Sequence, residues 1–438
     1  MLRTVGPSAL LTLLLVLFLS PALPAQDSGS GLSGSGVSGH GETGPAEPLP
    51  DLVLSFTGDL MAHSINYGMK DYREIYRNLN GLLLEDDLTF GNVEFPMDPS
   101  RPMASFPSFN IHPAYVQAFI DAGLDVFSLA NNHIADIGLG SLFATRHAAE
   151  TLAAENPRPL FFSGIAPEPE SGASGGTGSA PAASGGSSTA PSPGSAGEAD
   201  RWAGYPVTEI SSRGWKIGFL AVSQSSNNPV SREYLYQVDY TKPEQTEIFL
   251  DWLREVTGRY DLFILSYHGG VEYNFLPAPG KQRFFRELTE AGVDIVWGQH
   301  PHVLQPVELR DSPRGTGTIL YSMGNFLSGQ GRIIDETLPE EEWSYTGDSA
   351  IIRLTVGRDG ERGITVRNIR PVPVANYITP NRDVILYPLE ELVFQPLPPP
   401  WDLFYRERLR IMKGYFAGNI YRVKGEAETV VAQGAQLR

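Results

Sequence analysis

The chain has 438 residues, of which 41% are apolar, and its formal net charge is −17 at neutral pH. This length allows one large domain or two ordinary ones. The charge disfavours nucleic acid and anionic membrane surfaces as partners, because the long-range field repels them. No cysteine is present, which excludes disulfides, lipidated cysteines and thiolate metal sites. Any metal ion must therefore be held by His, Asp, Glu or Asn side chains.

The first 25 residues have the pattern of a secretory signal peptide. Arg3 gives a basic start, an apolar run follows from Leu10 to Leu19, and the small residues Ala22 and Ala25 suit cleavage by signal peptidase. We therefore expect an extracytoplasmic protein that is secreted, periplasmic or associated with the cell envelope. An uncleaved membrane anchor is the alternative, and the apolar run is short for a bilayer.

Two stretches rich in glycine and serine separate the structured parts of the chain. Residues 26–49 are expected to form a linker, which contains His40. The stretch at about 168–200 is expected to be a disordered insertion within one domain spanning 50–375, because its composition buries too little apolar surface to offset the ordering entropy. A linker between two domains is the alternative for this stretch. Residues 376–438 are expected to be a C-terminal extension with a helix or two.

Short β-branched or aromatic runs alternate with amphipathic segments between these stretches. The expected strands are Leu52–Phe56, Leu88–Phe90, Val126–Leu129, Ile217–Val222, Leu262–Ser266, Val293–Trp297, Ile319–Ser322 and Ala350–Val356. The expected helices are Pro113–Ala122, Leu139–Ala154, Glu244–Val256 and Gln282–Ala291. Strands separated by helices predict a layered α/β fold.

Polar side chains follow five of these strands at their carboxyl ends. Such ends share one edge of an open α/β sheet, where ligands bind. Each group alone suits a turn or a hydrogen bond as well as a metal ion, and only their joint placement predicts a metal site. The groups are Asp59, Asn92 with Glu94, Asn132 with His133, His268, and the pair His300 and His302 in Gly-Gln-His-Pro-His.

The pair His300 and His302 strengthens the prediction of a metal site. In an extended segment, residues two apart point in the same general direction, so His300 and His302 can both face the same site. His112 and His147 are expected at a helix start and on a helix surface, without a functional role. The sequence leaves the role of His63, four residues after Asp59, open.

Five sequence blocks contain these residues: SFTGDLMAH, FGNVEFP, LANNHIADIG, SYHGGVEYNFLPAPGKQRFFRELTEAGVDIVWGQHPHVLQPVE and ILYSMGNF. In this order they resemble the CapA family of capsule or poly-γ-glutamate synthesis proteins, whose domain is similar to the calcineurin-like metallophosphoesterases. The resemblance covers about residues 51–374. It implies a four-layer α/β/β/α sandwich of the metallophosphatase type, with a dinuclear metal centre at the strand ends.

The resemblance also implies a role for each residue. His133 matches the catalytic histidine, and the matching metal ligands are Asp59, Glu94, Asn132, His268, His300 and His302, with Glu94 as the candidate bridge between two ions. Two positions depart from the family pattern. A histidine ligand is replaced by Met61, and the family's Gly-Asp motif reads Gly91-Asn92, so one ion site has fewer ligands than usual. Candidates for orienting the ligands are Asn92, Glu272, His63 and Asn325.

The function implied is that of an exported CapA-like hydrolase or transferase in the synthesis, attachment or release of an anionic envelope polymer such as poly-γ-glutamate. One or two divalent ions of Mn, Zn or Fe per chain would polarise a phosphoryl or acyl oxygen and activate water. His133 would protonate the leaving group or stabilise developing charge. Envelope biosynthesis proteins are candidate partners, and the oligomeric state is left open. The alternatives are a general extracytoplasmic metallophosphoesterase acting on a small molecule and a non-catalytic accessory or binding protein.

Overall fold

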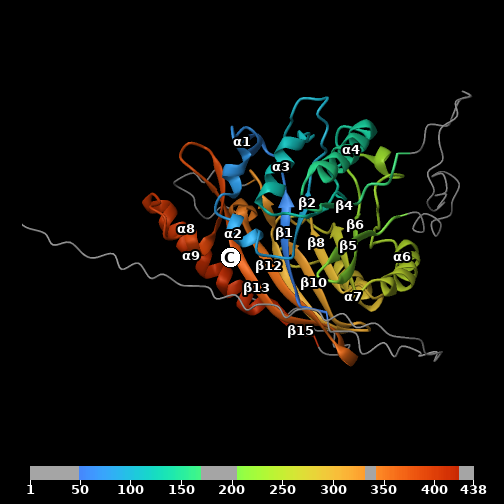
Figure 1. Cartoon of the computed structure of the whole chain (residues 1–438). Coiled ribbons are helices and arrows are strands. Elements are labelled where there is room, and N and C mark those ends of the chain that lie inside the picture. Colours follow the sequence, from blue (N-terminus) through green and yellow to red (C-terminus); the bar gives the residue numbers. More distant parts are fainter. Residues whose placement is uncertain (1–48, 169–204, 331–341, 424–438) are drawn as a thin grey trace, which may run out of the picture. The chain divides into compact units, whose positions relative to one another are not determined.

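The computed structural model describes residues 49–168, 205–330 and 342–423 (Figure 1). The expected signal peptide, the linker as far as residue 48 and the Gly/Ser stretch from residue 169 lie outside these residues. Within the described ranges, no helix is both long and apolar enough to cross a membrane.

The strands form one hydrogen-bonded sheet with two halves. The first half has the order β4 (Phe161–Ser163), β3 (Val126–Ser128), β2 (Leu88–Val93), β1 (Leu52–Leu60), β12 (Asp348–Asp359) and β13 (Gly363–Ile378). The second half has the order β10 (Gly315–Met323), β8 (Ile295–Gln299), β7 (Leu262–His268), β6 (Trp215–Ser223) and β5 (Thr208–Ser212). The two halves join where Gly315 on β10 pairs with Ile364 on β13.

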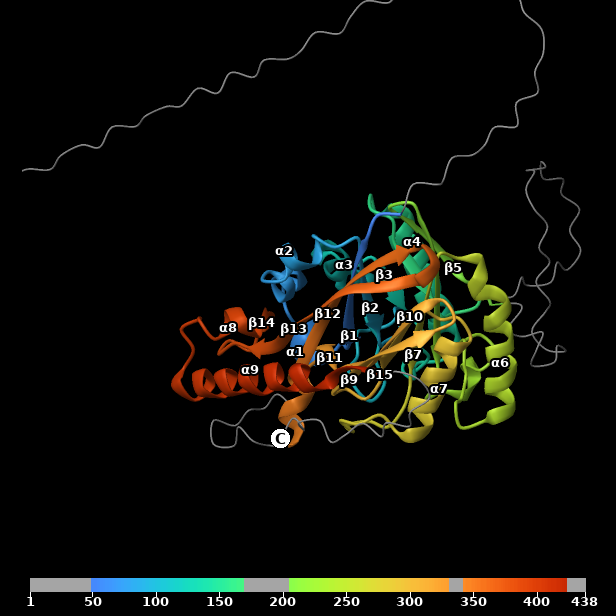
Figure 2. The ribbon, with the colours of Figure 1, turned by 90° about the horizontal axis from the view of Figure 1, so that it is seen from below.

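Four further strands extend this sheet. The strand β11 (Asn325–Leu327) pairs with β1, β14 (Val384–Pro388) with β13, β9 (Leu304–Ser312) with β10, and β15 (Ile420–Val423) with β9. The helix α9 (Pro399–Asn419) leads directly into β15 and contacts β9 and β13 (Figure 2). The chain from residue 376, which was expected to be an extension, therefore contributes strands to the same sheet as the rest of the domain.

The two halves pack face to face through aromatic side chains. Phe56 on β1 and Phe90 on β2 stack with their ring centres 4.6 Å apart, and the Trp297 ring from β8 lies 5.9 Å from each. Phe219 on β6 meets Phe90 at 5.7 Å. The Trp297 indole N–H donates a hydrogen bond to the carbonyl of Thr57 at 2.9 Å. Large buried rings with a satisfied polar group stabilise this interface and fix how the halves align.

Helices cover the outer faces and complete four layers (Figure 1). The helices α3 (Pro113–Ala122) and α4 (Leu139–Glu155) pack on the first half of the sheet, and α6 (Pro243–Val256) and α7 (Pro279–Glu290) pack on the second. Because side chains alternate along a strand, Phe219 faces the central core while its neighbour Leu220 packs with α6 and α7. The expected α/β/β/α sandwich is confirmed.

The structure contains all eight expected strands and all four expected helices, with shifts at their ends. The helix α7 begins at Pro279, three residues before the expected start, because proline fits the first turn of a helix. The strand β8 begins at Ile295 rather than Val293. The sequence analysis did not identify β4, β5, β9, β11, β13, β14, β15 or the short helices α1 (Ser64–Tyr67), α2 (Asn80–Leu83) and α8 (Leu389–Leu392).

The helix α7 carries a buried amine. Lys281 is fully buried, its Nζ donates a hydrogen bond to the carbonyl of Tyr321 at 3.0 Å, and it lies 5.2 Å from the centre of the Phe285 ring. Burial lowers the pKa of Lys281 to about 7, although the charge of Asp59 opposes this shift. The charged form is therefore disfavoured in the folded protein.

Replacement of this lysine is expected to change how stability depends on pH. Between its folded pKa of about 7 and its ordinary value of 10.5, Lys281 binds more protons in the unfolded chain, so its contribution to stability increases with pH. When the pH is raised from about 7 to 10.5, the unfolding free energy of wild type should therefore increase by roughly 1–4 kcal/mol relative to that of Lys281→Met. Urea denaturation across this range measures the shift. Lys216→Met, at an exposed lysine, is the control, and an equal response of the two variants would contradict the argument.

Candidate metal centre

The residues expected at the strand ends come together from both halves of the sheet. Strands β1, β2 and β3 run parallel to one another, and so do β6, β7 and β8, so their carboxyl ends lie at one edge. The first half supplies Asp59, Asn92, Glu94, Asn132 and His133, and the second half supplies His268, His300 and His302. All of them are buried except His300, which is partly exposed.

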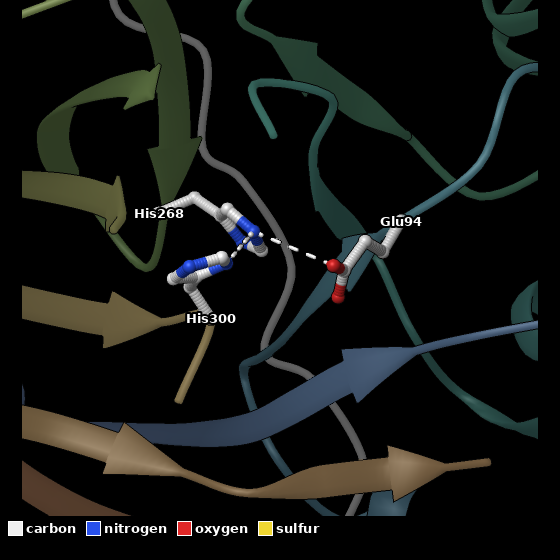
Figure 3. Close-up of side chains that lie close together, drawn as sticks. All are labelled: Glu94, His268 and His300. Atoms are coloured by element: carbon white, nitrogen blue, oxygen red, sulfur yellow. Dashed lines mark hydrogen bonds and ion pairs between the residues drawn. The ribbon is translucent and has the colours of Figure 1, made fainter. Parts of the chain in front are cut away.

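Glu94 faces two histidines of the other half (Figure 3). Its Oε1 lies 3.5 Å from His268 Nε2, and the same nitrogen lies 3.2 Å from His300 Nδ1. One potential ligand atom from each of these three residues lies within 4.8 Å of the others. This spacing suits side chains that bind a common cation.

A second group shares the same carboxylate. His302 Nδ1 lies 3.4 Å from Asp59 Oδ2, and its Nε2 lies 3.8 Å from Glu94 Oε1. Asp59, Glu94 and His302 again offer ligand atoms within 4.8 Å of one another. Because Glu94 belongs to both groups, it is placed to bridge two ions. The exposed Glu272 forms a third group with the histidine pair, at 3.9 Å from His300 Nε2.

The carboxylate of Glu94 is buried without a hydrogen-bond donor. Neither of its oxygens accepts a hydrogen bond from the described residues. The buried Oδ1 of Asn92 also accepts none from them. A buried carboxylate that accepts no hydrogen bond is costly, because folding removes its water and provides no donor instead. A divalent cation between Glu94 and the histidines would remove that cost. The residues present therefore fit a metal ion.

Three amides hold the ligand candidates in orientation. Asn325 Oδ1 accepts a hydrogen bond from His302 Nδ1 at 2.9 Å, which leaves Nε2 available to a metal ion. Asn92 Nδ2 donates to Asp59 Oδ1 at 2.9 Å and lies 3.1 Å from His268 Nδ1. Asn132 Oδ1 lies 2.8 Å from His268 Nε2, so it can exchange this contact for a metal ion beside the same histidine.

The loop after β8 differs from the extended segment that the sequence argument assumed. His300 and His302 have φ angles of 93° and 58°, which residues other than glycine rarely adopt. The N–H of His300 donates to Asp59 Oδ2 at 3.2 Å and helps to hold this bent loop against β1. Both imidazoles reach the centre, but the bent backbone directs them there and strand alternation does not. Strained backbone of this kind is concentrated at functional sites.

The charges at the centre shift neighbouring pKa values in opposite directions. Burial would raise the pKa of Asp59, but the hydrogen bond from His302 and the nearby histidine charges lower it. Burial also opposes the charged form of His302, yet Glu94 and Asp59 raise its pKa to about 9. Burial and the neighbouring histidines hold the pKa of His300 well below its usual range. His302 therefore loses a proton when it binds a cation at neutral pH.

His133 lies beside these groups and is oriented by an acid that the sequence analysis missed. Its Nδ1 donates a hydrogen bond to Asp136 Oδ2 at 2.8 Å, and the same oxygen accepts the N–H of Phe109 at 3.0 Å. Burial opposes the charged form of His133, but Asp136 and Glu94 outweigh burial and raise its pKa. Asn227, also missed, contacts both Asn132 and His133 from the loop after β6. The spacing of Asp136 three residues after His133 was the available signal.

The remaining candidates have more peripheral positions. Met61, in the position of a family histidine, is buried in the apolar core. His63 accepts a hydrogen bond from the N–H of Gly329 and belongs to none of the three groups. His112 lies at the start of α3, and His147 is exposed on α4, as expected.

Comparisons with known proteins identify the family of this chain. The model of the family described as "Bacterial capsule synthesis protein PGA_cap" matches residues 53–155 and 194–330. The chain therefore belongs to this family of bacterial capsule synthesis proteins. The matched ranges contain every residue of the candidate centre.

Individual relatives cover different parts of the chain. The "PGA biosynthesis protein CapA" of Bacillus subtilis (strain 168) is 32% identical over 137 residues, which span 30% of this chain and only 32% of that protein. The "Capsule biosynthesis protein CapA" of Bacillus anthracis is 26% identical over 358 residues, which span 76% and 71% of the two chains. Among solved structures, the NAD nucleotidase (NadN) of Haemophilus influenzae aligns with a TM-score of 0.42 and 11% identity, over 86% of this chain and 65% of that one.

The metal content of histidine variants tests the centre. We expect His300→Ala and His302→Ala to bind Mn, Zn or Fe at least about 10-fold more weakly than wild type, since each removes an imidazole ligand. Elemental analysis after reconstitution of metal-free protein measures this, with His147→Ala as the control and circular dichroism as a check of folding. If both variants lose stability and keep their metal, the two histidines are only hydrogen-bonding residues of the loop.

Proposed function

We propose that this protein acts outside the cytoplasm as a metal-dependent hydrolase or transferase in the synthesis, attachment or release of an anionic envelope polymer such as poly-γ-glutamate. Membership of the capsule synthesis family supports the polymer, and relatives are named for capsule, PGA or polyglutamine synthesis. The observation that carries the metal dependence is the buried Glu94 carboxylate, which has histidines of the other half beside it and no hydrogen-bond donor among the described residues.

The proposed ligands would hold one or two Mn, Zn or Fe ions, which these imidazole and carboxylate groups suit. They are Asp59, Glu94, Asn132, His268, His300 and His302, with Glu94 shared between the ions. A bound ion would supply Lewis-acid polarisation of a phosphoryl or acyl oxygen of the substrate. Since Met61 provides no nitrogen, the ion nearest to it would have fewer protein ligands.

His133 is the proposed general acid. Its Nδ1 is engaged by the Asp136 carboxylate, which can only accept, so Nε2 is the nitrogen left for the substrate. The raised pKa of His133 favours the protonated ring, which can give a proton to a leaving group. A protein that only binds the polymer has no need for this arrangement, so the contact between His133 and Asp136 favours catalysis over the accessory role.

The net charge of −17 restricts how a polyanion approaches. Its field repels a chain of carboxylates at long range, and salt weakens that repulsion. Bound divalent ions would offset the negative charge where the polymer meets the centre. A metallophosphoesterase acting on a small molecule is the second candidate, because the same acid and ions would serve a phosphoryl group.

A substrate panel with His133 and Asp136 variants tests the proposal. Metal-loaded wild type should cleave or transfer either γ-glutamyl peptides or phosphoesters, and the substrate that reacts separates the two candidates. His133→Ala should lower turnover by roughly 100- to 10,000-fold with metal content unchanged, and Asp136→Asn should lower it because the ring loses its fixed tautomer.

Two outcomes would contradict this proposal. Loss of metal from His133→Ala would show that the ring is a ligand and that the assigned roles are wrong. If metal-loaded wild type turns over no compound in the panel and binds poly-γ-glutamate, the protein is an accessory binding protein.

A further inference from the structure

His63 lies beside the candidate centre without contributing to its ligand groups. It follows the end of β1 and precedes α1, and its ring meets the Phe109 ring edge-on with centroids 5.5 Å apart. Phe109 meets His133 in the same manner at 4.9 Å. The Phe109 ring thus lies between His63 and the proposed acid and contacts both imidazoles.

A main-chain hydrogen bond fixes the proton on the His63 ring. The N–H of Gly329 donates to His63 Nδ1 at 3.0 Å, so that nitrogen presents a lone pair and carries no proton. The neutral ring then has its proton on Nε2, which can only donate. Burial, reinforced by the charges of His302 and His133, lowers the pKa of His63 to about 4, in agreement with a neutral ring. No described residue accepts a hydrogen bond from Nε2.

The short strand β11 and the residues after it contact both His63 and a proposed metal ligand. Asn325 begins β11, pairs with Asp59 and holds His302. Gly329, two residues beyond the end of β11, holds His63. A Cβ on Gly329 would lie 2.7 Å from the Cβ of His63, so only glycine allows the two segments to approach this closely. The same segment thus sets the geometry of the centre and of this donor.

We infer that His63 donates a hydrogen bond from Nε2 to an oxygen of the substrate's oxyanion group, a phosphate or a carboxylate, and is not a metal ligand. This inference rests on the proposed function, because the oxyanion is the group that the ions would hold. Nδ1 is already occupied by Gly329, and no atom of His63 joins the groups within 4.8 Å. His63 therefore does not replace the ligand missing at Met61. A neutral donor adds affinity for an anion without adding charge.

The tautomer can be measured without metal or substrate. Long-range proton–nitrogen NMR spectra of histidine-labelled protein should show an unprotonated Nδ1 and a protonated Nε2 for His63 at neutral pH, with His63→Asn used for assignment. The opposite tautomer would overturn the inference, because Nε2 would then have no proton to donate.

Two amide substitutions separate the function of His63 from its structural contact. The amide oxygen of asparagine can occupy the position of Nδ1 and accept from Gly329, but His63→Asn has no donor at the position of Nε2. The longer His63→Gln can place an N–H near Nε2 and loses the contact with Gly329. Inorganic phosphate is the probe, titrated calorimetrically into metal-loaded protein, and His147→Asn is the control.

We expect His63→Asn to bind phosphate roughly 10-fold more weakly than wild type at unchanged metal content, and His63→Gln to remain within about threefold of wild type. If His63→Gln binds phosphate more weakly than His63→Asn, only the contact with Gly329 matters. If His63→Asn loses its metal, His63 is a ligand. Unchanged affinity in both variants would overturn this inference alone. If wild type binds metal and no phosphate, this inference alone is overturned, and if it binds no metal, the proposed function is overturned as well.

Discussion

A carboxylate buried without a hydrogen-bond donor dominates the chemistry at the strand ends. Glu94 is fully buried, and its Oε1 lies within 4 Å of two imidazoles from the other half of the sheet. Such an arrangement is costly to fold unless a cation neutralises it. The amides of Asn92 and Asn325 and the bent loop with His300 and His302 keep potential ligand atoms directed at this point. The site is thus assembled at the expense of local stability, as is common where function requires preorganised charges.

Much of this arrangement could be predicted from the sequence because two simple regularities govern it. Apolar runs of strand length, separated by amphipathic segments, identified the strands that form the core of both halves and the helices outside them. The rule that ligands bind at the carboxyl ends of parallel strands then located the centre before any contact was known. Asp59, Glu94 and His268 followed from that rule, since each lies directly at or after a strand end.

The parts that could not be predicted depend on contacts between distant segments. Asn227 reaches His133 from the loop after β6, and only the folded chain shows that this loop faces the turn after β3. The strand β11 is three residues long and carries little pattern, yet it positions His302 through Asn325. The loop with His300 and His302 is bent because the His300 N–H bonds to Asp59 on β1 and the His302 side chain bonds to Asn325 on β11, and tertiary contacts of this kind override local preference.

Contacts between the halves at both ends of β10 give the centre a mechanical meaning. Gly315, where β10 meets β13, lies at one end of β10, and Asn325 at the centre lies ten positions further along, which is about 30 Å in extended chain. At that second end, β11 pairs with β1, the N–H of Asp59 donates to the carbonyl of Gly324 at 2.9 Å, and ligand candidates from both halves meet. In a chain without cysteine, an ion bound there would add a cross-link between side chains of the two halves to this main-chain pairing.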